Sequence, residues 1–273
     1  MKTKKFVIAI CLSGLVGFAG LACSVDPYDV AHRFQESMNM SAPLPAPIPD
    51  PNNFSFIHIT DLHYIDGANR HIPALTPKLA ASDAFIIASG DLTDGGQRAD
   101  FNAWRADSVA LGIPVFSAAG NHDLWNQGWD HFKTVLGPSV YSIVSGNVRI
   151  IVLDSGDDTL GADQYKWLER ELAATSQTWR IVVSHYNFFS PNIVETAQAT
   201  NREEIYGMMR MFEKYHVNYV LMGHSHIYDH RLINGVNYVV SPSLKEYVID
   251  EQKHFTRLNV SGGQMTHQLL SIY

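Results

Sequence analysis

Cysteine is scarce in this chain of 273 residues, which contains only Cys11 and Cys23. Cys11 lies in a segment that we expect to be removed on export, so the mature chain is not expected to form an internal disulfide. The fold must therefore be held by a hydrophobic core, and the length of the chain and its 46% of hydrophobic residues are sufficient for one.

Positive charge is also scarce. The chain has 20 lysine and arginine residues against 27 acidic ones, which gives a formal charge of −7 at pH 7. No stripe of basic residues of the kind that follows a phosphate backbone is visible in the sequence. Duplex DNA or RNA is therefore not the expected partner.

The apolar run near the start of the chain, Phe6–Leu21, is short for a membrane-spanning helix and rich in glycine. It follows three lysines and closes on small residues, a pattern typical of an export signal over residues 1–22. An uncleaved N-terminal anchor is the alternative. The pattern predicts an exported protein of the periplasm or cell envelope.

The residues Gly20-Leu21-Ala22-Cys23 resemble the cleavage box of bacterial lipoproteins, in which the new N-terminal cysteine carries a lipid. Such a lipid on Cys23 would attach the protein to a membrane. Because leucine stands one position later than in the usual box, ordinary cleavage after Ala22 remains a second hypothesis.

Residues 23–53 are predicted to form an arm, since five of them are prolines that alternate with single residues and cannot enter a sheet interior: Pro43, Pro45, Pro47, Pro49 and Pro51. Polyproline II is the expected conformation. The composition fits either a stiff spacer or a strap packed on the domain surface.

From residue 54 onward, short apolar runs alternate with helical patterns and turn signals. Helices are predicted near Arg98–Leu111, Asp163–Ala174 and Glu203–Tyr215. The last third is expected to contain antiparallel strands at Val236–Ser241, His254–Val260 and Met265–Ser271. We predict one α/β domain over residues 54–273, with two packed mixed β-sheets flanked by helices.

Five polar motifs follow in order along this domain, and several come directly after an apolar run: Asp61-Leu62-His63, Gly90-Asp91-Leu92-Thr93-Asp94, Gly120-Asn121-His122-Asp123, His185 and Gly223-His224-Ser225-His226. Residues just past the carboxyl ends of strands converge on one rim of a sheet. Their carboxylate, imidazole and amide groups are sufficient to bind two adjacent metal ions, which is typical of a hydrolase site.

Together these motifs resemble the signature of the calcineurin-like metallophosphoesterases, over residues 54 to about 245. The resemblance implies a four-layer αββα sandwich and a dinuclear metal site. It implies ligands to the first ion from Asp61, His63, Asp91 and His226, with Asp91 bridging to a second ion held also by Asn121, His185 and His224. It further implies that His122 serves as general acid, and we expect the carboxylate of Asp94 to orient it.

Mixed oxygen and imidazole ligands without thiolate suit manganese, iron or zinc. The resemblance implies that a hydroxide bridging the two ions attacks phosphorus. Asp94 stands where purple acid phosphatases carry a tyrosine ligand, and Gly95-Gly96 stands where phosphoprotein phosphatases carry an arginine that binds phosphate. The branch most similar to this chain contains bacterial cyclic-nucleotide and glycerophosphodiester phosphodiesterases.

The expected partner is a small phosphoester, with diesters favoured over monoesters. A diester has one negative charge at phosphorus and a monoester has two, so a diester loses less binding energy when the phosphate-binding arginine is absent. Two alternatives stay open: a phosphomonoesterase or pyrophosphatase acting on envelope substrates, and a non-catalytic binding module stabilised by metal. The aromatic residues beside the motifs, Tyr64, Trp125 and the Tyr186-Asn187-Phe188-Phe189 stretch of loop 186–201, either contact the substrate or belong to the packing.

Overall fold

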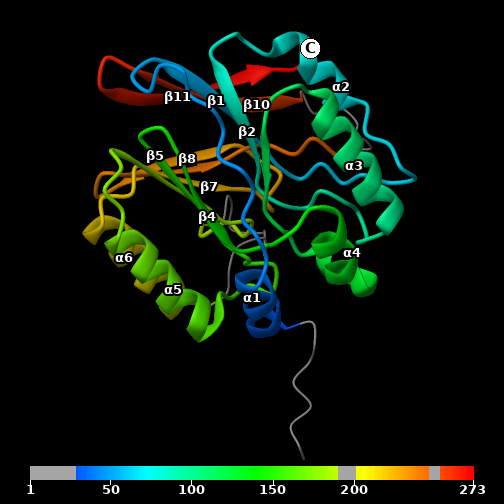
Figure 1. The fold of residues 1–273 in the computed structure, drawn as a ribbon, viewed down its shortest axis with the longest axis horizontal. Helices are drawn as coiled ribbons and strands as arrows, with labels where there is room; N and C mark the ends of the chain where they lie inside the picture. The colour runs from blue at the N-terminus through cyan, green and yellow to red at the C-terminus, as the bar shows by residue number, and fades with distance from the viewer. Residues whose placement is uncertain (1–28, 190–200, 246–252) are drawn as a thin grey trace, which may run out of the picture.

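Two β-sheets pack face to face, and helices cover the outer face of each sheet (Figure 1). The computed structural model describes residues 29–189, 201–245 and 253–273. The predicted fold class, an α/β sandwich of two mixed sheets flanked by helices, is confirmed. The signal segment and Cys23 lie outside the described residues, so export and lipid attachment stay predictions.

Each sheet combines neighbouring parallel strands with antiparallel strands. Over the described residues, the first sheet has the order β11-β10-β1-β2-β3, in which β1, β2 and β3 are parallel. The second has the order β4-β5-β6-β7-β9-β8, in which β5, β6, β7 and β9 are parallel. The strands are β1 (Phe54–Ile59), β2 (Asp83–Ala88), β3 (Val115–Ser117), β4 (Tyr141–Ser145), β5 (Val148–Val152), β6 (Trp179–Val183), β7 (Tyr219–Met222), β8 (Asp229–Ile233), β9 (Val236–Val240), β10 (His254–Ser261) and β11 (Gln264–Ser271).

Successive side chains of a strand point to opposite faces of its sheet, so each strand contributes to two apolar layers. Phe56 of β1 packs between the two sheets, where its ring stacks on that of Phe85 with centroids 4.7 Å apart. Ile57 and Ile59 of the same strand join the layer between this sheet and its helices. A slip of one residue would exchange the two faces, so burial fixes the register that places Asp61 beyond the strand end.

The helices form two groups (Figure 1). The first sheet is covered by α2, α3 and α4, and the second by α5 and α6, with α1 packed beside α5. The three predicted helices correspond to α3, α5 and α6 within two residues at each end. No helix in the described ranges is long and apolar enough to cross a lipid bilayer. The helices are α1 (Val30–Met38), α2 (His71–Leu75), α3 (Arg98–Ala110), α4 (Gly128–Val135), α5 (Gly161–Ala173) and α6 (Arg202–Lys214), with short 3-10 turns η1 (Thr76–Lys78) and η2 (His122–Gln127).

The predicted strands of the last third do not all pair with one another. The strand predicted at Val236–Ser241 is β9, which lies in the second sheet, parallel to β7 and antiparallel to β8. The other two predicted strands form the antiparallel pair β10 and β11 in the first sheet. The Asn234-Gly235 turn joins β8 to β9, and β8 was not predicted from the sequence.

The predicted arm is not extended throughout, because α1 lies within it and packs against α5. The guanidinium of Arg33 is fully buried and donates hydrogen bonds of 2.8 and 2.9 Å to Asp154 and one of 3.0 Å to Asp157. Burial alone would raise the pKa of Asp154, but the charge of Arg33 outweighs it and lowers that pKa. For these residues the structure shows a strap on the domain surface and not a free spacer.

The parallel strands direct the motif residues to one place. Asp61 follows β1, Asp91 follows β2, Asn121 follows β3, His185 follows β6 and His224 follows β7. Residues that come just after the carboxyl ends of parallel strands meet at the same edge, as the sequence analysis expected. Both sheets therefore contribute to one site.

Replacing Arg33 with alanine is expected to lower the free energy of unfolding by about 3–5 kcal/mol, because Asp154 would stay buried without its cation. Urea unfolding followed by circular dichroism measures the change. The control is Lys214→Ala, which breaks the exposed pair with Glu169 and should lower the free energy of unfolding far less than Arg33→Ala. Equal effects of the two substitutions would contradict this account of α1.

Candidate metal centre

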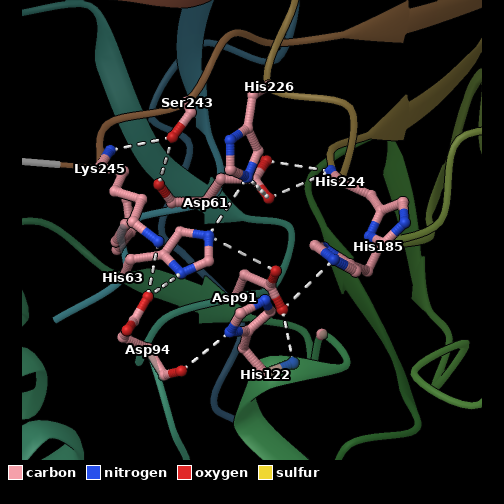
Figure 2. A network of polar contacts seen from close by, with 12 residues as sticks. Asp61, His63, Asp91, Asp94, His122, His185, His224, His226, Ser243 and Lys245 are labelled. Carbon is pink, nitrogen blue, oxygen red and sulfur yellow. Dashed lines mark hydrogen bonds and ion pairs between the residues drawn. The ribbon is translucent and has the colours of Figure 1, made fainter. Parts of the chain in front are cut away.

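Six of the seven predicted ligands converge from four separate loops at the rim where the strands of both sheets end (Figure 2): Asp61, His63, Asp91, His185, His224 and His226. The seventh, Asn121, follows β3, whose carboxyl end lies at the same rim. Potential ligand atoms of four residues lie within 4.8 Å of one another: Asp61, His63, Asp91 and His226. A second group within the same distance consists of Asp91, His185 and His224. Asp91 belongs to both groups, which is the position that the sequence analysis gave to a bridging ligand.

Two observations show that these residues fit cations. The carbonyl oxygen of Asn121, Oδ1, is buried and has no hydrogen-bond partner among the described residues. The ring nitrogens Nε2 of His63 and His226 face each other 3.2 Å apart. Buried polar atoms normally have partners, so a cation coordinated by the Asn121 oxygen would satisfy it, and ring nitrogens this close together are positioned to share one cation.

The backbone of the ligand loops is strained. Five of the ligands have a positive φ, in the left-handed region that non-glycine residues rarely adopt: Asp61 (52°), His63 (47°), Asp91 (49°), His224 (69°) and His226 (61°). Each such residue typically costs on the order of 1–3 kcal/mol and persists only where the surrounding fold enforces it. The surrounding strands therefore hold these side chains in place at a cost in stability.

Two motif glycines are needed because the loops touch. A Cβ atom on Gly120 would collide with the carboxylate of Asp91, and one on Gly90 would lie 2.6 Å from Nδ1 of His185. Gly90 also has a φ of 107°, which L side chains seldom adopt. These glycines allow the backbone to approach the ligands closely.

The histidine rings differ in protonation. Burial lowers the pKa of His63 and of His224 to about 4, so both rings are neutral at pH 7, the form that binds metal ions. Burial would also lower the pKa of His185, but the negative charge of Asp91 outweighs it and raises the pKa to about 9. The carboxylate of Asp91 thus attracts positive charge into the second group of ligands.

The prediction that the carboxylate of Asp94 orients His122 is wrong. Oδ1 of Asp94 accepts hydrogen bonds from Nδ1 of His63, at 2.9 Å, and from Nζ of Lys245, at 2.7 Å (Figure 2). His122 is held instead by the backbone carbonyl of Asp94, which lies 2.8 Å from its Nδ1. Asp94 therefore fixes the ring of a ligand, His63, and supports His122 only through its main chain.

His122 itself lies at the predicted place beside the ligands. Its backbone N–H donates a 2.9 Å hydrogen bond to Oδ1 of Asp91, and its ring centroid lies 4.6 Å from that of His63. Because a carbonyl oxygen only accepts, Nδ1 of His122 carries the hydrogen in its bond to Asp94. The other ring nitrogen, Nε2, is left to exchange a proton with a bound molecule.

Two groups that support the site were not predicted from the sequence. Asp123 is fully buried and its carboxylate accepts hydrogen bonds from the backbone of Leu92, Thr93 and Gly120, so it ties two ligand loops together. Lys245 follows β9 and reaches Asp94 from a distant part of the chain. Asp123 belongs to the motif Gly120-Asn121-His122-Asp123, so its place beside the site could have been predicted. Nothing in the sequence indicates that Lys245 lies there.

The aromatic residues beside the motifs have different environments. Tyr64 is buried, and its hydroxyl donates a 2.6 Å hydrogen bond to Asp107, so it belongs to the packing. Tyr186 stacks on His224 with ring centroids 4.1 Å apart, and Trp125 lies over His122 at 3.9 Å. Residues 190–200 of the loop after Tyr186 lie outside the described residues.

Comparison with known proteins agrees with this geometry. Over 156 residues the chain is 31% identical to a probable cyclic nucleotide phosphodiesterase of Synechococcus sp., a match that covers 50% of this chain and 59% of that protein. It is 23% identical over 192 residues to the 3',5'-cyclic adenosine monophosphate phosphodiesterase CpdA of Escherichia coli, covering 67% of this chain and 69% of that protein. The chain thus matches about three fifths of the first relative's length.

Among solved structures, the fold is similar to that of a dimetal phosphatase from Danio rerio, with a TM-score of 0.64 and 15% identity. That match covers 82% of this chain and 98% of the other. The profile of the calcineurin-like phosphoesterases matches residues 54–228, which hold all the predicted metal ligands. The chain therefore belongs to the calcineurin-like phosphoesterase family.

Proposed function

We propose that this chain is a two-metal phosphoric ester hydrolase that cleaves phosphodiesters in preference to monoesters. The observation that carries the proposal is the place of Asp91, which is shared by two groups of ligands while His122 lies directly beside them. A shared carboxylate between two cation positions, with an acid–base group at the edge, is the arrangement that phosphoryl transfer by two metals requires.

The donor set suits manganese, iron or zinc, since it offers carboxylate, amide and imidazole atoms and no thiolate. Two such ions bound there would polarise a phosphoryl oxygen and lower the pKa of a water molecule. The chain's own contribution is to hold the ligand side chains in a fixed orientation.

The orientation of His63 illustrates this contribution. Asp94 accepts the hydrogen of Nδ1, which leaves the lone pair of Nε2 directed at the ligand group, 3.6 Å from Oδ2 of Asp91. Lys245 balances the charge of Asp94 from the other side. A buried imidazole fixed in this way needs no rearrangement when a cation binds.

His122 is the proposed general acid. Its Nδ1–H is committed to the Asp94 carbonyl, so a proton on Nε2 is the one that it can give to the leaving alkoxide. The nearby Asp91, which accepts the backbone N–H of His122, keeps this ring beside the ligand groups. The leaving oxygen is therefore expected on the side of the site where His122 lies.

The preference for diesters is supported by the charges around the site. No arginine contacts the ligands among the residues that the structure describes, and Lys245 is already paired with Asp94. A monoester has two negative charges and gains more from an added cation than a diester with one. Two of the sequence relatives carry the name of a cyclic nucleotide phosphodiesterase, which also favours diesters.

The first test compares hydrolysis of bis(p-nitrophenyl) phosphate and p-nitrophenyl phosphate by the manganese-loaded protein. We expect a higher kcat/KM for the diester, and a loss of at least about 10³-fold in Asp91→Ala, because metal ions contribute several kcal/mol to the barrier. A preference for the monoester would overturn the substrate proposal. Loaded wild-type protein that hydrolyses neither ester would favour a binding module.

The second test examines the role of His122. His122→Ala should slow hydrolysis of a diester with a poor leaving group, such as 3',5'-cyclic AMP, by about 10²–10⁴-fold, since its alkoxide needs a proton. Hydrolysis of bis(p-nitrophenyl) phosphate should fall much less, because p-nitrophenolate is a stable anion. The kcat values on both substrates measure the difference.

The matched control is His131→Ala, because Nδ1 of His131 also lies 2.8 Å from a backbone carbonyl, that of Gly96, but His131 is not a predicted ligand. Its ratio of the two kcat values should equal that of the wild type. Equal losses on both substrates in His122→Ala, with bound metal retained, would rule out a general acid at this position.

A further inference from the structure

Trp125 is a large apolar side chain that the fold leaves half exposed, at 50%, at the edge of the metal centre. Its ring centroid lies 3.9 Å from that of His122, with an angle of 36° between the planes. His122 in turn contacts His63, one of the ligands. The open part of the indole is therefore one ring away from the proposed general acid.

The backbone around Trp125 is built to present this side chain. Trp125 has an extended conformation (φ −67°, ψ 157°) that interrupts the helical turn, and Asn126 and Gln127 follow with positive φ values of 51° and 64°. Nδ2 of Asn126 donates a 3.0 Å hydrogen bond to the carbonyl of Gly95. The loop that carries Trp125 is thus attached to the loop that carries Asp94.

Glycines fix the distance between these two loops. A Cβ atom on Gly96 would collide with the backbone carbonyl of Trp125, and it would lie 3.0 Å from the Cα of Gly128. A Cβ atom on Gly128 would collide with the carbonyl of Asp123. Only glycine lets these backbone segments lie in contact. The backbone position of Trp125 is therefore set by main-chain contacts.

We propose that the exposed indole of Trp125 binds a flat aromatic ring on the alcohol side of the substrate, of the nucleobase class. This inference rests on the proposed function, because it places the leaving oxygen at His122. A leaving alcohol within reach of His122 carries its substituent past the neighbouring ring, and that ring is Trp125. Tryptophan offers a wide apolar face on which any nucleobase can stack, whatever its identity.

The size of the effect follows from other base-binding proteins. Stacking on one aromatic side chain typically strengthens the binding of a base by about 5- to 100-fold. An aliphatic side chain of similar hydrophobicity would keep the loop but lose most of this stacking. Selectivity for a ligand with a base over the same ligand without one is therefore the property that reports on Trp125.

The experiment measures the binding of AMP and of ribose 5-phosphate to the manganese-loaded full chain by isothermal titration calorimetry. The two ligands share the sugar and the phosphate and differ in the base. The wild type should bind AMP about tenfold or more tightly than ribose 5-phosphate. In Trp125→Leu this ratio should fall to about one or two, whereas Trp125→Phe should retain most of it.

The matched control is Tyr206→Leu, which removes an aromatic residue of similar exposure, 55%, from α6. It should leave the ratio of the two affinities as in the wild type. Circular dichroism spectra that match the wild type would confirm that each variant is folded.

The outcomes separate the two proposals. Equal affinities of the wild type for both ligands, or an unchanged ratio in Trp125→Leu, would overturn the base-binding role while diester hydrolysis still supports the proposed function. If Trp125→Leu weakens both ligands to the same extent, Trp125 only supports His122, and the inference is wrong. A loaded protein that binds neither ligand and hydrolyses no ester would refute the proposed function as well.

Discussion

Buried negative charge at the rim of the sandwich is the constraint on which the structure of the site depends. Asp61 and Asp91 are at most 1% exposed, and no lysine or arginine contacts either of them among the residues that the structure describes. Burial of carboxylates in such surroundings is costly unless cations balance them. Burial lowers the pKa of His63 and of His224 to about 4, so these two rings supply neutral lone pairs beside the carboxylates, and bound metal ions are the partners that this arrangement fits.

The rest of the fold stabilises this arrangement of ligands, although its backbone is strained. Positive φ values at five ligands store strain, and the close contacts at Gly90 and Gly120 allow no larger side chain. Strands with apolar residues on both faces anchor the loops, because a change of register would exchange the side chains of the two packed layers. The strap α1 adds a further buried ion pair through Arg33 and Asp154, next to Ser155, whose hydroxyl accepts the backbone N–H of His185.

The sequence was sufficient to predict the features that depend on order along the chain. Strand ends followed by ligand residues placed Asp61, Asp91 and His224 at one rim, and helical periodicity located α3, α5 and α6. The sequence does not show which way a side chain points between two loops. The carboxylate of Asp94 was therefore assigned to His122, whereas it binds His63. Lys245 and β8 show the same limit, because Lys245 pairs with Asp94 of a loop far away in the sequence and β8 forms only by pairing with β9.

We infer that two cations balance these carboxylates and share Asp91. The most direct test is the number of manganese ions bound per folded chain, measured by equilibrium dialysis, with the electron paramagnetic resonance spectrum of the loaded protein. The account predicts two ions per chain and a spectrum with spin coupling between them, which Asp91→Asn should abolish. A single uncoupled ion in the wild type, or none, would contradict it.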